Sequence, residues 1–113
     1  MRPGGVKWES CKPSEAIRAC PLGPALADAK TTVLVKTESL EVIRLIVPAG
    51  KEIASHRTRG EVTIQCLEGE VGILVKGITE VLSAGQLLYL NKNELHAVHG
   101  IRDASLLVTI LLA

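Results

Sequence analysis

The sequence predicts an all-β sandwich or barrel, and three observations support this fold class. Short runs rich in Val, Ile, Leu and Thr recur at roughly 8–12-residue intervals, separated by Gly, Asn, Asp and Pro. The 113 residues, 47% of them hydrophobic, have the length of one domain and suffice for a sizeable core. The strand patterns do not alternate with helix-length patterns, as they would in βαβ units. We therefore expect one all-β domain.

The expected strands follow an irregular N-terminal arm. Residues 1–30 hold four of the five prolines and are expected to form an arm of the same domain, with the barrel spanning residues 31–113. Within the arm, Ser14 is expected to cap one helical turn that ends before Pro21. The nine predicted strands are Thr31–Lys36, Leu40–Val47, Ile53–His56, Glu61–Leu67, Val71–Val75, Ile78–Leu82, Leu87–Leu90, Leu95–His99 and Ser105–Leu112. Turns are predicted between them, including one at Glu68–Glu70 and one at Gly100–Asp103.

Several predicted strands are apolar at consecutive positions, notably 33–35, 45–47 and 106–112. Strands of this kind are buried on both faces, and no helical layer is available to cover the second face. We therefore expect a homodimer that packs sheet on sheet. The alternative is a monomer whose outer face is covered by residues 1–30.

Composition and charge exclude several functions. The 13 basic and 12 acidic residues give a net charge of +1, and aromatic residues make up 2% of the chain. A nucleic-acid-binding surface would need excess positive charge or aromatic platforms for bases, so we expect no nucleic-acid partner. Three cysteines without a Cys-x-x-Cys pair do not form a disulfide framework, and Cys11 and Cys20 are expected to act as small hydrophobes. The absence of a signal-peptide pattern and of a long apolar run predicts a cytoplasmic chain with no membrane partner.

Two motifs of glycine and histidine lie between residues 50 and 100. Gly50, His56 and Gly69 fit a pattern of glycine, five residues, His-x-His, three or four residues, Glu, six residues and glycine. Gly85 and His96 fit a second pattern of glycine, five residues, Pro-x-Gly, two residues and His. On these spacings the chain resembles a small single-domain cupin of the RmlC-like superfamily. The resemblance implies a double-stranded β-helix (jelly-roll) barrel with a short irregular N-terminal arm.

The chain departs from the cupin pattern at metal-ligand positions. Thr58 replaces the second His of His-x-His, and Val62 stands where the Glu belongs, with Glu61 one place early. Cupins of known activity hold a divalent metal with three His and one Glu, so the resemblance implies a degenerate site that retains His56 and His96. Because two imidazoles leave most coordination positions to water, we expect one weakly bound divalent ion at most: Fe, Mn, Ni, Zn or Cu.

The face that Glu61 occupies decides what else lies near the histidines. In the run 61–66 polar and apolar residues alternate, so Glu61, Thr63 and Gln65 share one face and Val62, Ile64 and Cys66 the other. The motif spacing and the burial preference of Val and Ile favour an inward apolar face. The cavity would then be lined by His56, Thr58, His96 and Cys66. A bulge near Gly60 would instead turn Glu61, and with it Gln65, toward the histidines and restore a carboxylate ligand.

The remaining candidates have plainer interpretations. His99 follows His96 by three residues, which places it on the opposite face of a strand. Cys66 is expected to fill the core rather than act as a thiolate, because no basic neighbour is evident. Arg57 and Arg59 are expected at the pocket rim, and the alternation does not assign Tyr89 to a face.

Three functions remain open on the sequence. The first is a cupin-fold protein that binds a small organic ligand, together with a weakly held divalent metal, through His56 and His96. The alternative is a metal-dependent enzyme, an oxygenase or isomerase acting on a small organic acid, with Glu61 as the third metal ligand. The third is a structural role with the barrel as a dimerisation unit. The chain shows no nucleophile beside a base, no phosphate-binding glycine loop and no zinc-type Cys/His spacing.

Overall fold

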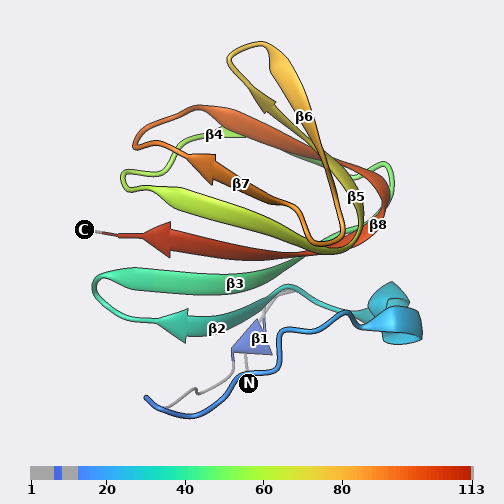
Figure 1. Ribbon diagram of the computed structural model, residues 1–113, viewed down its shortest axis with the longest axis vertical. Helices are drawn as coiled ribbons and strands as arrows, with labels where there is room; N and C mark the ends of the chain where they lie inside the picture. Colours follow the sequence, from blue (N-terminus) through green and yellow to red (C-terminus); the bar gives the residue numbers. More distant parts are fainter. Residues whose placement is uncertain (1–6, 9–12, 113) are drawn as a thin grey trace.

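The protein is built almost entirely of β-strands, which confirms the predicted fold class (Figure 1). The computed structural model describes residues 7–8 and 13–112. Its elements are β1 (Lys7–Trp8), the 3₁₀ helix η1 (Gly23–Asp28), β2 (Thr32–Lys36), β3 (Leu40–Val47), β4 (Glu52–His56), β5 (Val62–Val75), β6 (Ile78–Ser83), β7 (Leu87–Leu90) and β8 (His96–Leu111).

Two long strands, β5 and β8, are shared between two layers of the barrel. The C-terminal half of β8 pairs with β3, and the N-terminal half of β5 pairs with β7; these halves form one layer together with β2 and β1. The first part of β8 pairs with β4, and the second half of β5 pairs with β6; these form the other layer. Because both long strands pass from one layer to the other, the layers enclose a single core (Figure 1).

The turns predicted at Glu68–Glu70 and Gly100–Asp103 are wrong, because the chain continues through both positions as strand. The pairing of β5 with β8 shifts register three times between Cys66 and Val71, so bulges replace the expected turns. Gly69 has φ +80°, and the space where a side chain would begin is filled by the backbone of Asp103 and Ala104. Glycine therefore marks a bend where two strands touch, not a chain reversal.

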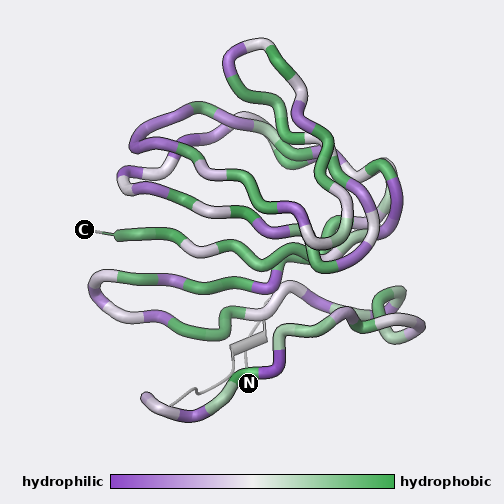
Figure 2. Tube along the Cα trace, viewed as in Figure 1, coloured by the Kyte–Doolittle hydropathy of each residue, from purple (hydrophilic) through white to green (hydrophobic). Residues whose placement is uncertain are grey.

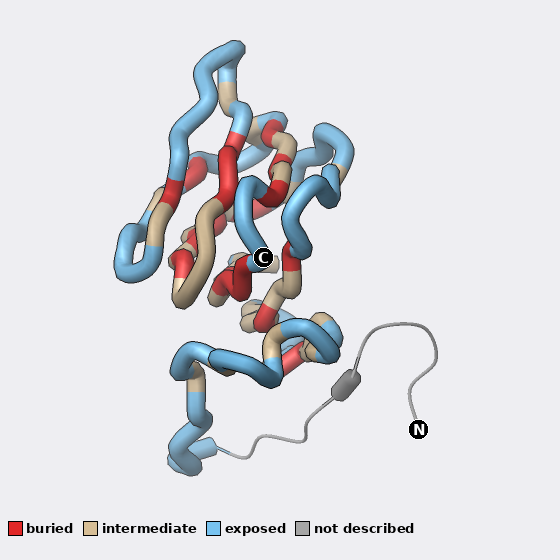
Figure 3. Tube along the Cα trace, turned by 90° about the vertical axis from the view of Figure 1, so that its right-hand side faces the viewer, coloured by how far each residue is buried: buried red, intermediate tan, exposed pale blue. Residues whose placement is uncertain are grey.

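The core lies between the two layers, as the buried segments in Figure 3 show. It is aliphatic throughout and consists of Val47, Val62, Ile64, Cys66, Val71, Ile73, Leu82, Leu90, Val98, Ala104, Leu106 and Val108. The apolar residues of β5 therefore point inward, which is the register that the motif spacing favoured. Figure 2 shows that apolar residues make up much of β3 and of the second half of β8; residues 45–47 and 106–108 are consecutive apolar positions.

Residues 13–30 of the N-terminal arm are irregular apart from one helical element, which lies further along the chain than predicted. Residues 15–22 contain no helix, and the 3₁₀ helix η1 follows them, with Pro24 in its first turn. Ser14 has φ +69°, which is not the extended conformation of a helix cap. The arm and η1 lie at the end of the molecule opposite the β5–β6 hairpin (Figure 1).

The buried Arg44 and the half-buried Glu68 hold the arm on the barrel. Arg44 is 7% exposed and donates from Nη1 to the carbonyl of Cys20 at 2.9 Å and from Nη2 to that of Arg18 at 3.0 Å. The Glu68 carboxylate accepts the backbone N–H groups of Leu22 at 2.8 Å and Gly23 at 3.0 Å, and also the Ser105 hydroxyl. Four of these five hydrogen bonds join a charged side chain of the barrel to the backbone of residues 18–23.

No helix in residues 7–8 and 13–112 combines the length and the apolar character needed to cross a membrane.

Candidate functional site

A pair of histidines lies where β4 ends and β8 begins. His56 is the last residue of β4, His96 is the first of β8, and the two are opposite each other in the antiparallel pairing. Their ring centroids are 4.3 Å apart and the ring planes are inclined by 55°. Val75 of β5 pairs with His96 from the other side and packs against the core, so the pair occupies the inner face of this layer.

Both rings are held in the same way by backbone oxygen atoms. The Nδ1 atom of His56 lies 3.1 Å from the carbonyl oxygen of Ala54, and Nδ1 of His96 lies 3.0 Å from that of Glu94. A carbonyl oxygen only accepts hydrogen bonds, so each Nδ1 carries the proton. In the neutral rings both Nε2 atoms therefore keep a lone pair, which is the state that a metal ion or a hydrogen-bond donor requires.

The two histidines differ in their exposure to solvent. His96 is 4% exposed, whereas His56 is exposed, so the pair extends from the surface into the barrel. Burial lowers the pKa of His96 below its ordinary value of 6.5; the hydrogen bond to the Glu94 carbonyl opposes this shift, and the nearby His56 adds to it. His96 is consequently neutral at pH 7 and available as a ligand.

Thr58 lies beside the pair in sequence but not on a strand. Because β4 ends at His56, the expectation that Thr58 shares a face with His56 through strand alternation does not apply. Its hydroxyl donates to the carbonyl of Gly60 at 3.1 Å, and its own carbonyl accepts the backbone N–H of Asn93 at 3.0 Å. The hydrogen bond between Thr58 and Asn93 therefore connects the loop before β5 with the loop before β8.

Cys66 lies in the core, as expected for a core-filling residue. It pairs with Leu106 in the second half of β8, whereas the histidine pair is at the start of that strand. The thiol faces the carbonyls of Glu68 and Gly69 at 3.4 and 3.6 Å. Burial raises the pKa of the Cys66 thiol, so it remains protonated at pH 7.

The carboxylate of Glu61 is hydrogen-bonded to a residue other than the two histidines. It accepts a hydrogen bond from the hydroxyl of Tyr89, and this bond raises the pKa of the tyrosine. Tyr89 pairs with Thr63, so both lie on the outer face of the layer, on the side opposite the buried Ile64 and Leu90. The bulge that would have turned Glu61 inward is not formed, since β5 keeps its register from Val62 to Cys66.

Within the described parts of the chain, no group of three or more His, Cys, Asp and Glu side chains is placed to hold a metal ion. The structure thus does not bring Glu61 together with His56 and His96. Two imidazoles with free Nε2 atoms fit one weakly held divalent ion or a polar group of an organic ligand, but not a site with three protein ligands.

Three further candidates, His99, Arg57 and Arg59, lie outside the core. The ring of His99 lies over Gly72, its partner on β5, and faces away from the core. Arg57 and Arg59 are exposed beside the histidine pair. The carbonyls of Ala54 and Glu94, which orient the rings, were not predicted, because backbone acceptors two residues before each histidine leave no signal in the sequence.

The fold matches those of solved cupins. A cupin superfamily protein from Desulfitobacterium hafniense superposes with a TM-score of 0.72 at 15% identity, over 88% of this chain and 100% of that one. An RmlC-like cupin from Desulfovibrio desulfuricans gives a TM-score of 0.66 at 24% identity, over 91% and 95% of the two chains. A conserved protein of unknown function from Streptococcus pyogenes gives 0.70 at 20% identity, over 74% and 73%.

No family model and no curated protein matches the sequence. The structural matches nevertheless agree on the architecture: the chain has the double-stranded β-helix fold of the small RmlC-like cupins, as the two glycine and histidine motifs predicted.

Proposed function

We propose that this cupin-fold protein binds a small organic ligand in the barrel through His56 and His96, and that the same two imidazoles hold a divalent metal ion weakly. The observation that carries this proposal is the pairing of the two rings, 4.3 Å apart with each Nδ1 on a backbone carbonyl. Two neighbouring imidazoles at the edge of an aliphatic core favour a ligand with one polar end and an apolar body.

A bound metal ion would supply a Lewis acid for an oxygen atom of the ligand, while this chain would orient it through the two rings. With two protein ligands, affinity would be well below that of a three- or four-ligand site. The enzyme alternative required Glu61 as a third ligand, and the hydrogen bond of Glu61 to Tyr89 gives it no support.

Isothermal titration with Ni²⁺ and Zn²⁺ at pH 7 tests the metal proposal. We expect weak one-to-one binding by the wild type, and a loss of about tenfold or more in His56→Ala and in His96→Ala. His99→Ala is the matched control, because this histidine lies on the outer face over Gly72 and should leave binding unchanged. Equal binding by all four proteins would remove the histidine pair as a metal site.

The binding of an organic ligand is tested by a separate measurement. Mass spectrometry of ligands released from the freshly purified wild type should detect a small organic compound that is depleted from His96→Ala. Recovery of the same compound in equal amount from both proteins would contradict a role for His96.

A further inference from the structure

The loop of residues 91–95 carries the carbonyl that holds the proton of His96. The carbonyl oxygen of Glu94 lies 3.0 Å from Nδ1 of His96. Glu94 precedes β8, so the position of this oxygen depends on the backbone conformation of the loop and not on strand pairing. Whatever fixes the loop therefore also fixes the ring and its proton.

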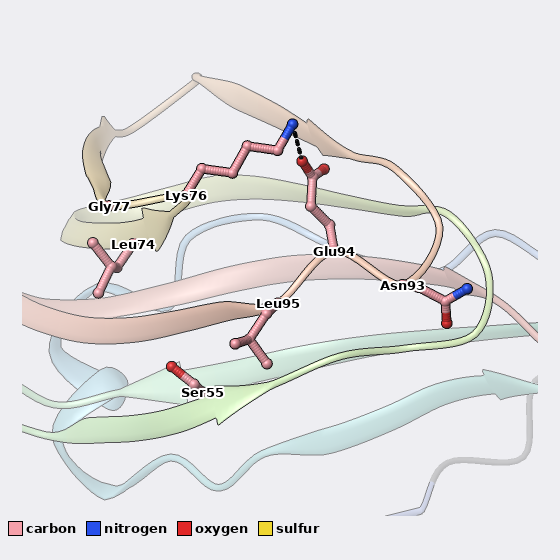
Figure 4. A pocket seen from close by; sticks show the side chains of 7 residues that line it. All are labelled: Ser55, Leu74, Lys76, Gly77, Asn93, Glu94 and Leu95. Carbon is pink, nitrogen blue, oxygen red and sulfur yellow. Dashed lines mark ion pairs between the residues drawn. The ribbon is translucent and has the colours of Figure 1, made fainter.

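The side chain of Glu94 holds the loop from within. Its Oε1 accepts the backbone N–H of Asn91 at 2.8 Å, and its own backbone N–H donates to the Asn91 carbonyl at 3.3 Å. The Glu94 side chain is 18% exposed, and its other oxygen lies 3.1 Å from the Lys76 ammonium. In Figure 4 the carboxylate points toward Lys76, whereas the side chains of Asn93 and Leu95 point away from it. Since the Lys76 side chain is 78% exposed, the ion pair contributes little, and the bond to Asn91 is the stronger anchor.

The loop has a further fixed point at Asn93. The backbone N–H of Asn93 donates to the carbonyl of Thr58 at 3.0 Å, and its φ is +60°. Asparagine adopts this left-handed conformation more readily than most residues with a side chain. Hydrogen bonds at both Asn91 and Asn93 thus hold the conformation of residues 91–94.

The second cupin pattern has Pro where this chain has Asn91, and Gly where it has Asn93. A proline ring restricts the backbone by itself but has no N–H to donate. Asn91 has an N–H, and the Glu94 carboxylate accepts it. In this chain a side-chain hydrogen bond therefore restricts the backbone at the place where a proline ring would otherwise do so.

His56 is held differently, because no loop lies between this histidine and its acceptor. Ala54, whose carbonyl oxygen lies 3.1 Å from Nδ1 of His56, belongs to the same strand, β4. A change confined to the loop before β8 should alter His96 and leave the proton of His56 in place. His56 is therefore an internal reference for His96.

We propose that Glu94 is a positioning residue of the histidine site: through its bond to Asn91 it keeps its own carbonyl on Nδ1 of His96, which leaves Nε2 of that ring unprotonated. The consequence for binding rests on the proposed function, in which Nε2 of His96 holds a metal ion. An imidazole whose Nδ1 loses its acceptor divides its proton between both nitrogen atoms, and a protonated Nε2 cannot bind a metal. Loss of such an orienting partner typically lowers metal affinity by about 10–100-fold.

Two-bond ¹H–¹⁵N correlation spectra of the full chain at about pH 8 test this role, because they distinguish the protonated from the unprotonated nitrogen of a neutral imidazole. In the wild type the unprotonated nitrogen should be Nε2 in both histidines. In Glu94→Ala the two nitrogen signals of His96 should move toward each other, whereas those of His56 should stay. Unchanged His96 signals in Glu94→Ala would overturn the proposal, and so would equal changes in both histidines.

Glu94→Gln is the conservative variant. Its amide oxygen can still accept the N–H of Asn91 although the charge is gone, so His96 should keep the wild-type tautomer. Glu80→Ala is the matched control, because Glu80 is exposed on β6 and its loss should leave both rings as in the wild type. Loss of the wild-type tautomer in Glu94→Gln would assign the effect to charge and not to the bond with Asn91, and would overturn the proposal.

Titration of the same proteins with Zn²⁺ separates this role from the proposed function. Glu94→Ala should bind Zn²⁺ about tenfold more weakly than the wild type, and Glu94→Gln and Glu80→Ala should bind it as the wild type does. If the wild type binds no Zn²⁺ while the His96 tautomer changes in Glu94→Ala, the metal site is refuted and the positioning role stands. If the wild type binds Zn²⁺ and the His96 tautomer is the same in Glu94→Ala, the positioning role is refuted and the metal site stands.

Discussion

At the scale of single residues, the histidine pair combines one exposed and one buried imidazole. The pKa of the buried His96 ring is lowered, because removing its charged form from water costs free energy. The same burial that makes His96 neutral also makes the fold sensitive to acid. Protonating His96 would place a charge inside the barrel beside a second imidazole.

His96 should titrate below 6.5, and this is measurable by NMR of its ring protons. Because its pKa in the folded state lies below the ordinary value of 6.5, the unfolded chain binds more protons between those two values. Stability should therefore fall as the pH drops through that interval. In His56→Ala the pKa of His96 should rise but stay below 6.5, since burial is the larger cause. A value above 6.5 in the wild type would contradict this account.

Cys66 should be inert in the native protein. Its thiol is fully buried, and this burial is the largest cause of its raised pKa, which disfavours the reactive thiolate. In a chain with Cys11→Ser and Cys20→Ser, a thiol reagent should label Cys66 only under denaturing conditions. Rapid labelling of the native double variant would show that the strand around Cys66 opens.

At the scale of elements, two glycines that resemble turn glycines differ in what surrounds them. Gly69 and Gly85 both have positive φ, but only Gly69 faces another segment of backbone, at Asp103 and Ala104. Gly69→Ala should therefore destabilise by about 3 kcal/mol or more, from backbone strain and overpacking together. Gly85→Ala, with open space around it, should cost about 1 kcal/mol. Urea unfolding of the two variants measures this difference, and equal losses would refute the close approach of β5 and β8.

The docking of the arm depends on Glu68. Burial alone would raise the pKa of Glu68, but hydrogen bonds from Ser105, Leu22 and Gly23, together with the charge of Arg44, lower it below 4.5. The ionised carboxylate thus stabilises the fold above that pH, and the contribution is lost as the pH falls through the folded-state value.

Glu68→Gln should destabilise the protein by about 1–3 kcal/mol, because an amide has one acceptor oxygen for three donors. Limited trypsin digestion should cut faster after Arg18, whose carbonyl is held by Arg44 in the same cluster. Glu70→Gln is the control, since Glu70 contacts the exposed Arg102 at 3.9 Å and should matter little. Unchanged stability and digestion in Glu68→Gln would mean that the arm is held by other contacts.

At the scale of the whole molecule, we propose a homodimer that packs through the outer face of the layer formed by β2, β3, β8, β5 and β7. On this face Leu87 is 60% exposed and Tyr89 is 55% exposed, and residues 18–23 of the arm dock elsewhere on the barrel, around Arg44 and Glu68. Light scattering after size exclusion should give the mass of a dimer. Leu87→Glu should weaken association about tenfold or more. Val81→Glu, a charge at a 48% exposed position of the other layer, should not. A wild-type monomer at all concentrations would reject the proposal.

The sequence by itself predicted the fold class and the inward face of β5, and it singled out the two histidines that the structure pairs. Strand alternation at Val62, Ile64 and Cys66 is a local property that survives folding, and the spacing of Gly50, His56, Gly69, Gly85 and His96 is shared by cupins.

Only the tertiary structure decided which glycines lie at a bend within a strand and which lie in a turn between strands. The difference depends on contact with a distant segment, such as 103–104 beside Gly69. Tertiary contacts also decided the partner of Glu61, which is Tyr89 of β7, and the tautomers of the two rings, which are set by the carbonyls of Ala54 and Glu94. Burial, hydrogen-bond partners and proton affinity come from residues that are far apart in the chain or belong to the backbone. No local pattern in the sequence records them.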